Sequence, residues 1–204
     1  MDFTNGHIYH VFNRSNNSQV IFPNRDKYLF FLAKINEFIK PHAQILAWCL
    51  MPTHFHLMID VDNYKIQSLN DPSTEVLPAN PNIKYRTLND SVAIMLRSYT
   101  RTINLKYKRH GSLFQQHTKA VCLTEPQLTP SYFQSQFGTI GNISIPEKEY
   151  PNVCFNYIHM NPVNDRLVKS PEDWEFSSYR DYFCGRNGKL VNKELAKEIG
   201  LFEE

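Results

Sequence analysis

The stretch from Ile45 to Asp60, ILAWCLMPTHFHLMID, decides the fold of this chain. Two apolar runs flank Pro52, which fixes its own φ and donates no ladder hydrogen bond, so the stretch predicts two short strands joined by a turn. Side chains alternate between the two faces of a strand. His54 and His56 are therefore expected on one face of a sheet, with Phe55 on the other. Two imidazoles side by side on a sheet face can chelate one divalent metal ion.

The histidine pair is a weak signal when it is taken alone. The chain contains 8 histidines, and a His-x-His spacing arises by chance in roughly one such sequence in three. Two half-exposed strand histidines that bind nothing are an equally good interpretation at this point. The choice between the two interpretations depends on what the rest of the sequence places near the pair.

Length and composition narrow the class of protein. The chain has 204 residues, of which 42% are hydrophobic and 21% charged, as is ordinary for a folded globular protein. A net charge of +2 does not itself argue for a nucleic-acid partner, so any basic surface must come from local clustering. The 4 cysteines form no Cys-x-x-Cys pair, so neither a zinc knuckle nor a disulfide framework is indicated. The sequence shows no leader peptide and no membrane-spanning run, so we expect a cytoplasmic protein without a membrane partner.

The hairpin stands between other elements that the same reasoning predicts. Aromatic and β-branched runs predict strands over residues 6–14 and 118–123. Apolar residues at three- and four-residue spacing predict helices over residues 24–40 and 90–108, with Asn24 and Asn89 as their N-caps. The resulting order is the ferredoxin-like βαββαβ arrangement, an α+β fold with an antiparallel sheet and helices on one face. The other face is left open for a ligand, and His54 and His56 are expected to point there.

A third helix is predicted from about residue 145 or 146 to Asn161. Pro162 is expected to end it, because the residue before a proline is disfavoured in the helical region. Two proline-dotted stretches without periodicity are expected to be loop-like insertions, at about residues 63–88 and 124–148. We expect one domain over residues 1–184, followed by a C-terminal tail over residues 185–204 that contains a short helix.

Cations gather along the predicted second long helix and just after it. No acidic residue follows Asp90 in this stretch, and Phe114 and Gln115 come shortly after it. The five basic residues are Arg97, Arg101, Lys106, Lys108 and Arg109. Cations beside an aromatic ring and an amide suit a phosphate backbone with stackable bases. A helix face that is merely solvated is an equally good interpretation of the charges.

Several separated motifs together resemble one family, the REP-associated tyrosine transposases, which belong to the single-tyrosine HUH transposases of small insertion sequences. The motifs are YHVFNR from Tyr9, WCLMPTHFHLMI from Trp48, RHGSLFQ from Arg109, YIHMNPV from Tyr157 and WEFSSY from Trp174. Their order and spacing cover most of the chain and are much more specific than the histidine pair alone.

The resemblance implies a ferredoxin-like nuclease that acts on single-stranded DNA next to a hairpin. In that family the two histidines hold Mg²⁺ or Mn²⁺, a role that carries over to His54 and His56. The family's nucleophile is a tyrosine, a role that carries over to Tyr157. A polar residue one helical turn later completes the metal site in relatives, and Asn161 holds that position. Residues four apart lie on one face of a helix, so Tyr157 and Asn161 can face the same ion.

Other residues compete for these roles. Tyr99 and Tyr107 are rival nucleophiles on the basic helix, although Tyr99 falls in its apolar stripe. His159 is expected to face DNA or to be structural, and Asn161 could instead cap backbone groups. The candidates for DNA contact are Asn13, Arg14, Arg97, Arg101, Lys108, Arg109, Phe114 and Gln115.

Three functions remain open at this stage. The first is a metal-dependent transposase that cleaves and rejoins single-stranded DNA near hairpin-forming repeats through a 5′-phosphotyrosine, in the cytoplasm and associated with a nucleoid. The second is a hairpin-binding protein on the same scaffold without catalysis. The third is a metal-dependent phosphodiesterase with a water nucleophile, for which Tyr157 would be dispensable. Both a monomer and a homodimer are compatible with the sequence.

Overall fold

Four antiparallel strands form the central sheet of the computed structural model, which describes residues 1–67, 84–125, 132–135, 138–141 and 149–203. Their order is β2-β3-β1-β6, which is the ferredoxin-like order that the sequence predicts. The bounds are Ile8–Arg14 for β1, Ala43–Met51 for β2, His54–Val61 for β3 and Lys119–Cys122 for β6. The expected α+β architecture is therefore confirmed.

The predicted hairpin over residues 45–60 is formed by β2 and β3. Met51 pairs with His54 and Leu50 with Phe55, so only Pro52 and Thr53 connect the two strands. A bulge between Ile45 and Ala47 interrupts the register in β2. The tight turn fixes which side chains of β3 point to each face.

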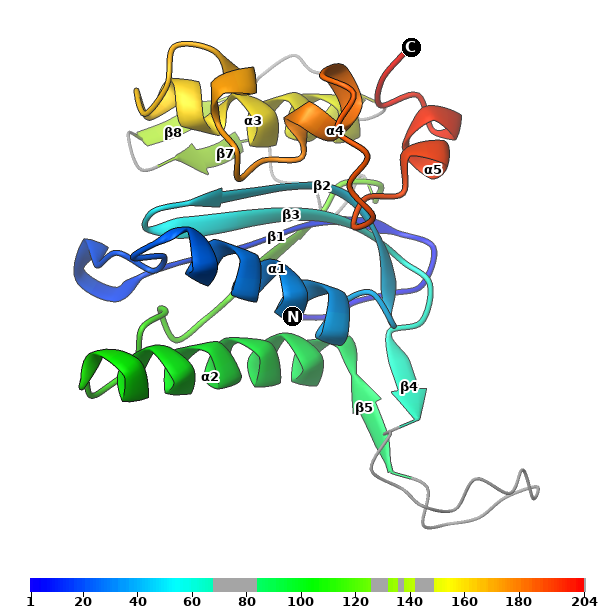
Figure 1. Ribbon diagram of the computed structural model, residues 1–204. Coiled ribbons are helices and arrows are strands. Elements are labelled where there is room, and N and C mark those ends of the chain that lie inside the picture. The colour runs from blue at the N-terminus through cyan, green and yellow to red at the C-terminus, as the bar shows by residue number, and fades with distance from the viewer. Residues whose placement is uncertain (68–83, 126–131, 136–137, 142–148, 204) are drawn as a thin grey trace.

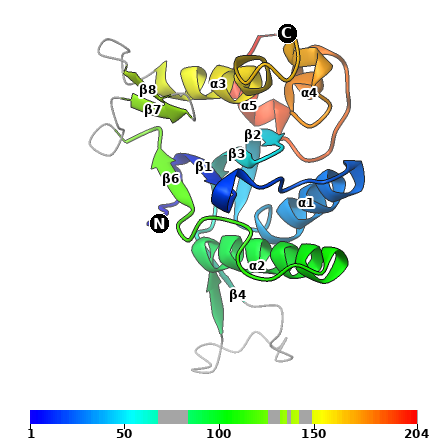
Figure 2. The same ribbon diagram turned by 90° about the vertical axis from the view of Figure 1, so that its left-hand side faces the viewer.

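Helices cover both faces of the sheet. Helices α1 (Arg25–Phe38) and α2 (Leu88–Tyr107) lie on one face, and α3 (Tyr150–Asn164) lies across the other (Figures 1 and 2). The hydrophobic core between the sheet and the first two helices is aromatic: the ring centroid of Phe31 lies 5.2 Å from that of Phe55 and 5.0 Å from that of Tyr99. This core keeps β3 rigid beneath α3.

The two long helices begin with different caps. Asn24 caps α1 as predicted, since its side chain accepts a hydrogen bond from Lys27 N. The prediction that Asn89 caps α2 is wrong, because Thr87 is the cap. The Thr87 hydroxyl accepts from Asp90 N while the Asp90 carboxylate accepts from Thr87 N, and this reciprocal pair satisfies two backbone donors where a single amide would satisfy one.

Helix α3 differs from its prediction at both ends. It begins at Tyr150, and it continues through Pro162 to Asn164. Pro162 has no N–H group to donate to Ile158 O, so one helical hydrogen bond is lost near the end of the helix. The proline ring is buried, and its packing offsets this loss. Backbone bonding resumes at once, with Asp165 N donating to Asn161 O at 2.9 Å. Asn161 is thereby kept inside the helix.

The chain after α3 folds back on the outer edge of β2. Leu50 N donates to Phe176 O at 2.8 Å, and Ser178 N donates to Trp48 O at 2.9 Å. Trp174 Nε1 also donates to Leu50 O at 3.1 Å. Residues 174–178 therefore cover a strand edge that would otherwise be open to pairing with another chain.

Three short helices complete the C-terminal part: η3 (Pro171–Asp173), α4 (Tyr179–Phe183) and α5 (Lys193–Glu198). The last of them confirms the predicted short terminal helix. The C-terminal tail is packed against the sheet, since Asn192 N donates to Ile45 O at 2.8 Å and both Leu201 and Phe202 are buried. A single-turn helix, η1 (Asn16–Ser18), follows β1.

Both expected insertions contain strands where loops were predicted. Strands β4 (Lys65–Gln67) and β5 (Tyr85–Thr87) pair with each other, as do β7 (Tyr132–Ser135) and β8 (Gly138–Gly141). Figure 1 shows the β4–β5 pair extending away from the start of α2. The remaining parts of the two insertions lie outside the described residues. Among the helices that are described, none is long and apolar enough to span a lipid bilayer.

Candidate active site

The two histidines of β3 point away from the aromatic core. Phe55 contacts Phe31 and Phe114 on the side of α1 and α2. His54 and His56 lie on the opposite face, next to Asn161 of α3, with their ring centroids 5.1 Å apart. His56 is buried and His54 is half-buried. The predicted division of side chains between the two faces is confirmed.

Asn161 joins the two histidines from α3. Its Oδ1 atom lies 3.2 Å from His54 Nε2, and its Nδ2 atom lies 3.4 Å from His56 Nε2. The amide oxygen can accept only, so His54 Nε2 donates to it, and the amide N–H donates to His56 Nε2. Three potential metal ligands therefore converge from two elements, and Asn161 faces the site as the sequence suggested.

Tyr157 lies one helical turn before Asn161. Its ring stands edge-on to His56, with centroids 5.5 Å apart and an interplanar angle of 87°. Burial raises the pKa of the Tyr157 hydroxyl, and a hydrogen bond with Asn161 offsets part of that rise. The phenol is therefore protonated at neutral pH and must lose its proton in order to act as a nucleophile.

Both site histidines are neutral at physiological pH. Burial lowers the pKa of His56 well below its usual value, and the charges of His10 and His54 add to the effect. Burial also lowers the pKa of His54, while Asn161 and the Asp165 carboxylate act in the other direction. Neutral imidazoles keep a lone pair available for a metal ion.

The donor set fits a divalent cation. Two neutral imidazole nitrogens and an amide oxygen are ligands that Mn²⁺ accepts, and Mg²⁺ takes the oxygen readily. Asp165, the C-cap residue of α3, adds a negative charge that acts on both His54 and Tyr157. Asp165 was not among the predicted site residues; its position four residues after Asn161 was the available signal.

The rival tyrosines lie on the wrong side of the sheet. Tyr99 is fully buried, and its hydroxyl donates to Ile21 O at 3.0 Å, which confirms that it belongs to the core. The Tyr107 hydroxyl lies 3.3 Å from Asn24 Nδ2 at the end of α2. His159 is also structural, since it is 2% exposed and its Nε2 atom lies 2.7 Å from Ser178 Oγ.

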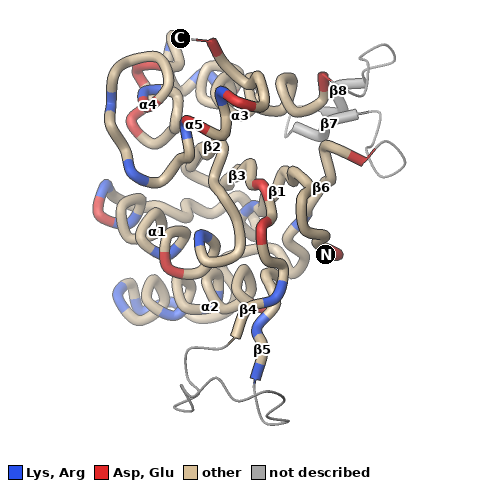
Figure 3. Tube along the Cα trace, turned by 90° about the vertical axis from the view of Figure 1, so that its right-hand side faces the viewer, with Lys and Arg blue, Asp and Glu red and all other residues tan. Residues whose placement is uncertain are grey.

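A groove runs along α2 beside the segment that follows it, and we call it the basic groove. Its volume is about 1080 Å³. Lys and Arg recur along this helix in Figure 3. Six of the predicted DNA contacts line it: Arg97, Arg101, Lys108, Arg109, Phe114 and Gln115. Arg109 also donates to Gln19 Oε1, which partly holds its guanidinium in place.

Two of the predicted DNA contacts are structural instead. Asn13 pairs with Phe55 in the sheet register and is 4% exposed, so its side chain lies on the core side, where Nδ2 donates to Thr118 Oγ1 at 2.8 Å. Phe114 is 3% exposed and packs on Phe31 and Phe55, so its ring cannot stack on a base. Arg14, in contrast, is exposed and pairs with His54 across the sheet.

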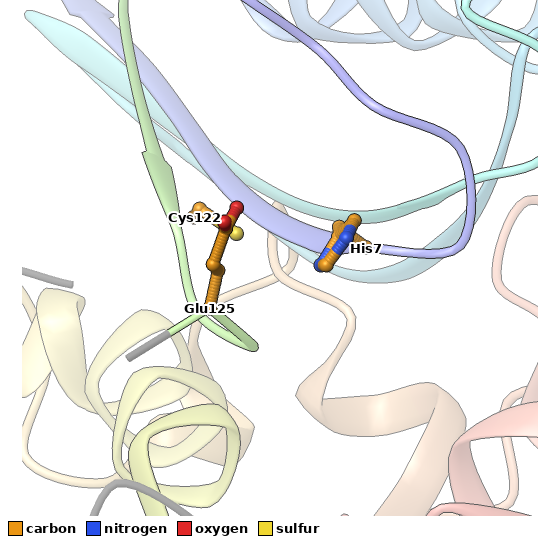
Figure 4. A group of neighbouring side chains, drawn as sticks. All are labelled: His7, Cys122 and Glu125. Atoms are coloured by element: carbon orange, nitrogen blue, oxygen red, sulfur yellow. The ribbon is translucent and has the colours of Figure 1, made fainter. Parts of the chain in front are cut away.

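A second group of ligand-type side chains lies at the other end of β1 (Figure 4). The ligand atoms of His7, Cys122 and Glu125 all lie within 4.8 Å of one another. The Thr124 hydroxyl is 3.1 Å from His7 Nδ1. His7 precedes β1, whereas His54 and His56 lie opposite Arg14 and Phe12, so the two groups are separate.

The fold and the site define a ferredoxin-like α+β protein with a His-x-His pair under a helix that carries a tyrosine. No family model matches the sequence, and no curated protein matches it. A solved structure does share the fold: the REP-associated tyrosine transposase bound to a REP hairpin superposes with a TM-score of 0.55 and 15% sequence identity. The match covers 94% of this chain and 92% of that one, so the fold is shared over nearly the whole length.

Proposed function

We propose that this chain is a metal-dependent transposase that cleaves and rejoins single-stranded DNA near hairpins. One observation carries the proposal: His54 Nε2, His56 Nε2 and the Asn161 amide converge one turn from Tyr157. The fold shared with a tyrosine transposase that was solved with a REP hairpin supports this choice of chemistry and of DNA partner. The sequence motifs around Tyr9, Trp48 and Tyr157 support it independently.

His54, His56 and Asn161 would hold Mg²⁺ or Mn²⁺. When bound, the ion withdraws charge from a phosphate oxygen and orients the scissile bond. Asn161 has a further task, because its hydrogen bond lowers the pKa of Tyr157 relative to burial alone. The same amide therefore serves the ligand set and the nucleophile.

Tyr157 would supply the nucleophile. Its Oη atom loses the phenolic proton and forms a bond to phosphorus as the bond from phosphorus to the 3′-oxygen breaks, and that oxygen leaves as a 3′-hydroxyl after taking up a proton. The product is a 5′-phosphotyrosine. Attack by another 3′-hydroxyl reverses the step and restores Tyr157, so the strand is rejoined without an external energy source.

The basic groove would bind the DNA backbone on the α2 side of the sheet, on the face opposite the histidine pair. Arg97 and Arg101 are exposed there, on successive turns of α2. Exposed cations on one helix face neutralise phosphates without reading base sequence. The identity of the hairpin must therefore be read elsewhere on the protein.

A covalent trapping experiment tests the proposed function. Hairpin-bearing single-stranded DNA labelled at its 3′ end is incubated with the protein and Mn²⁺ and resolved on a denaturing gel. We expect the 3′ label to migrate with the protein and a 5′ label to appear on a free fragment, because the 5′-phosphate stays on the tyrosine. Tyr157→Phe should lose the adduct, while Tyr107→Phe, a matched loss of one phenol, should keep it.

The alternatives predict different gels. Cleavage that persists in Tyr157→Phe without an adduct would identify a phosphodiesterase with a water nucleophile. Hairpin binding without any cleavage by the wild-type protein would identify a binding protein that lacks catalysis. Either outcome contradicts the tyrosine mechanism.

A further inference from the structure

A buried histidine that the sequence analysis did not select lies next to the site. His10, in β1, is 3% exposed, and its Nε2 atom is 2.8 Å from His56 Nδ1. Its ring stacks on Phe12 and on His56, with centroid distances of 4.7 and 5.0 Å. The rings of Tyr157 and His10 meet edge-on, with their centroids 6.0 Å apart. His10 thus contacts the predicted metal ligand His56 at Nδ1, whereas Asn161 contacts the other ring nitrogen of His56, Nε2.

The contact with His10 determines which nitrogen of His56 carries its proton. Two imidazole nitrogens 2.8 Å apart share one proton, so one of the two rings donates and the other accepts. The Asn161 amide N–H points at His56 Nε2, which must therefore accept. The His56 proton then sits on Nδ1 and is donated to His10 Nε2. This tautomer leaves the Nε2 lone pair of His56 directed into the site.

His54 is held differently. Its Nε2 atom donates to Asn161 Oδ1, and its Nδ1 atom lies 3.1 Å from the Thr53 hydroxyl. A hydroxyl can donate or accept, so Thr53 is compatible with both tautomers of His54. His56 is thus held in its ligating form before any ion arrives, whereas His54 is free to change form when one binds.

We propose that His10 is a positioning residue that sets the tautomer and ring orientation of His56 for metal binding. The inference rests on the proposed function, in which His56 is a ligand. Histidine ligands commonly donate their second N–H to a fixed acceptor, and loss of that acceptor weakens metal binding by about 10- to 100-fold. In this chain the acceptor is the unprotonated nitrogen of another imidazole.

Two substitutions of similar size separate hydrogen bonding from packing. His10→Gln keeps an acceptor oxygen at about the reach of Nε2, whereas His10→Leu fills the space without one. Nitrogen–proton correlation NMR of the metal-free proteins reports which ring nitrogen of His56 is protonated. We expect the Nδ1–H form in the wild-type protein and in His10→Gln, and a mixture of forms in His10→Leu. A wild-type His56 protonated at Nε2, or an unchanged tautomer in His10→Leu, overturns the inference.

Binding of Mn²⁺ alone, followed by electron paramagnetic resonance, gives the second measurement. We expect His10→Leu to weaken binding by about 10- to 100-fold and His10→Gln to retain most of it. Equal loss in both variants would show that ring packing matters instead, and no loss in either would show that His10 has no role. Thermal unfolding of both variants checks that the comparison is made on folded protein.

A third variant distinguishes failure of the inference from failure of the proposed function. His56→Ala should abolish this Mn²⁺ binding; if it binds as well as the wild-type protein, the proposed metal centre is wrong. All proteins carry Glu125→Gln, which removes the carboxylate that Mn²⁺ prefers, so that the group formed by His7, Cys122 and Glu125 does not add a second binding event. The NMR measurement contains no metal and judges the tautomer independently.

Discussion

The Nε2 atom of His54 and the Oδ1 atom of Asn161 lie 3.2 Å apart, although 107 positions separate the two residues in the chain. The histidine belongs to β3, a central strand of the sheet, and the asparagine belongs to α3, the helix that covers the face opposite α1 and α2. The proposed ligand set is therefore complete only when α3 is docked on the sheet. Under the proposed function, metal affinity would report on helix docking as well as on the ligands.

Replacement of Asn161 should lower or preserve metal affinity, depending on whether the new side chain keeps an oxygen ligand. Asn161→Leu removes the oxygen and should weaken Mn²⁺ binding by at least about tenfold, or ~1.4 kcal/mol. Asn161→Asp keeps an oxygen and adds a charge, so it should bind at least as tightly as the wild-type protein. Calorimetric titration measures both. Asn156→Asp is the control, since it adds the same charge at an exposed position of α3 and should leave affinity unchanged.

The rate of adduct formation should rise with pH. Burial raises the pKa of Tyr157, so only a small fraction is tyrosinate at neutral pH, and that fraction grows about tenfold per pH unit below the pKa. Single-turnover rates between about pH 7 and about pH 9, at constant ionic strength and saturating Mn²⁺, measure the effect. A rate that is flat over this range would show that loss of the Tyr157 proton does not limit the reaction.

The basic groove should contribute non-specific affinity for single-stranded DNA. The double variant Arg97→Ala with Arg101→Ala removes two exposed cations from the groove and should weaken binding of any sequence. Each lost phosphate contact lowers the salt slope by about 0.7, so the double variant should lower it by about 1.4. Fluorescence anisotropy at several salt concentrations measures the slope. Lys169→Ala with Lys189→Ala, two exposed cations outside the groove, should leave it unchanged.

The fold should lose stability in mild acid because several histidines are buried in neutral form. Burial lowers the pKa of His159 to about 3, whereas an unfolded chain has a histidine pKa near about 6.5. Because the unfolded state binds the proton first, the contribution to stability is present above about pH 6.5 and is lost as pH falls toward about 3. The cost is about 1.4 kcal/mol per pH unit for each such group. His10 behaves in the same way.

Urea unfolding at a series of pH values, with a chelator present, measures this loss of stability. His159→Gln retains an amide that can reach Ser178 but cannot take up a proton in this range. This variant should take up about one proton fewer on unfolding than the wild-type protein, so its free energy of unfolding should depend less steeply on pH. An unchanged dependence would show that His159 is not the group responsible.

The sequence was informative about the sheet because alternation and helical spacing are local properties. The hairpin around Pro52 and the element order were both predictable from side-chain pattern and turn chemistry. The start of α2 was missed, although the Thr87-x-x-Asp90 spacing of its capping box can be read in the sequence. The end of α3 was not predictable, because burial of Pro162 outweighs the single hydrogen bond that it forgoes.

The candidate site was predictable only where spacing along one element decides it. Spacing alone puts His54 and His56 on one face of β3, and Tyr157 and Asn161 on one face of α3. In the structure these two faces meet. Contacts that depend on the register between strands were not predictable. Pairing of β1 with β3 puts His10 against His56, and the same register turns Asn13 into the core and away from DNA.

The segment from Trp174 to Ser178, hydrogen-bonded along β2, ties the C-terminal side of α3 to the sheet that carries the histidines. A single copy of the chain thus brings Tyr157 to His54, His56 and Asn161. In the proposed reaction one phenol would hold one DNA end at a time. Because excision of a segment needs two strand breaks, a lone molecule would have to free Tyr157 from the first end before cutting the second, or a second molecule would have to hold the other end.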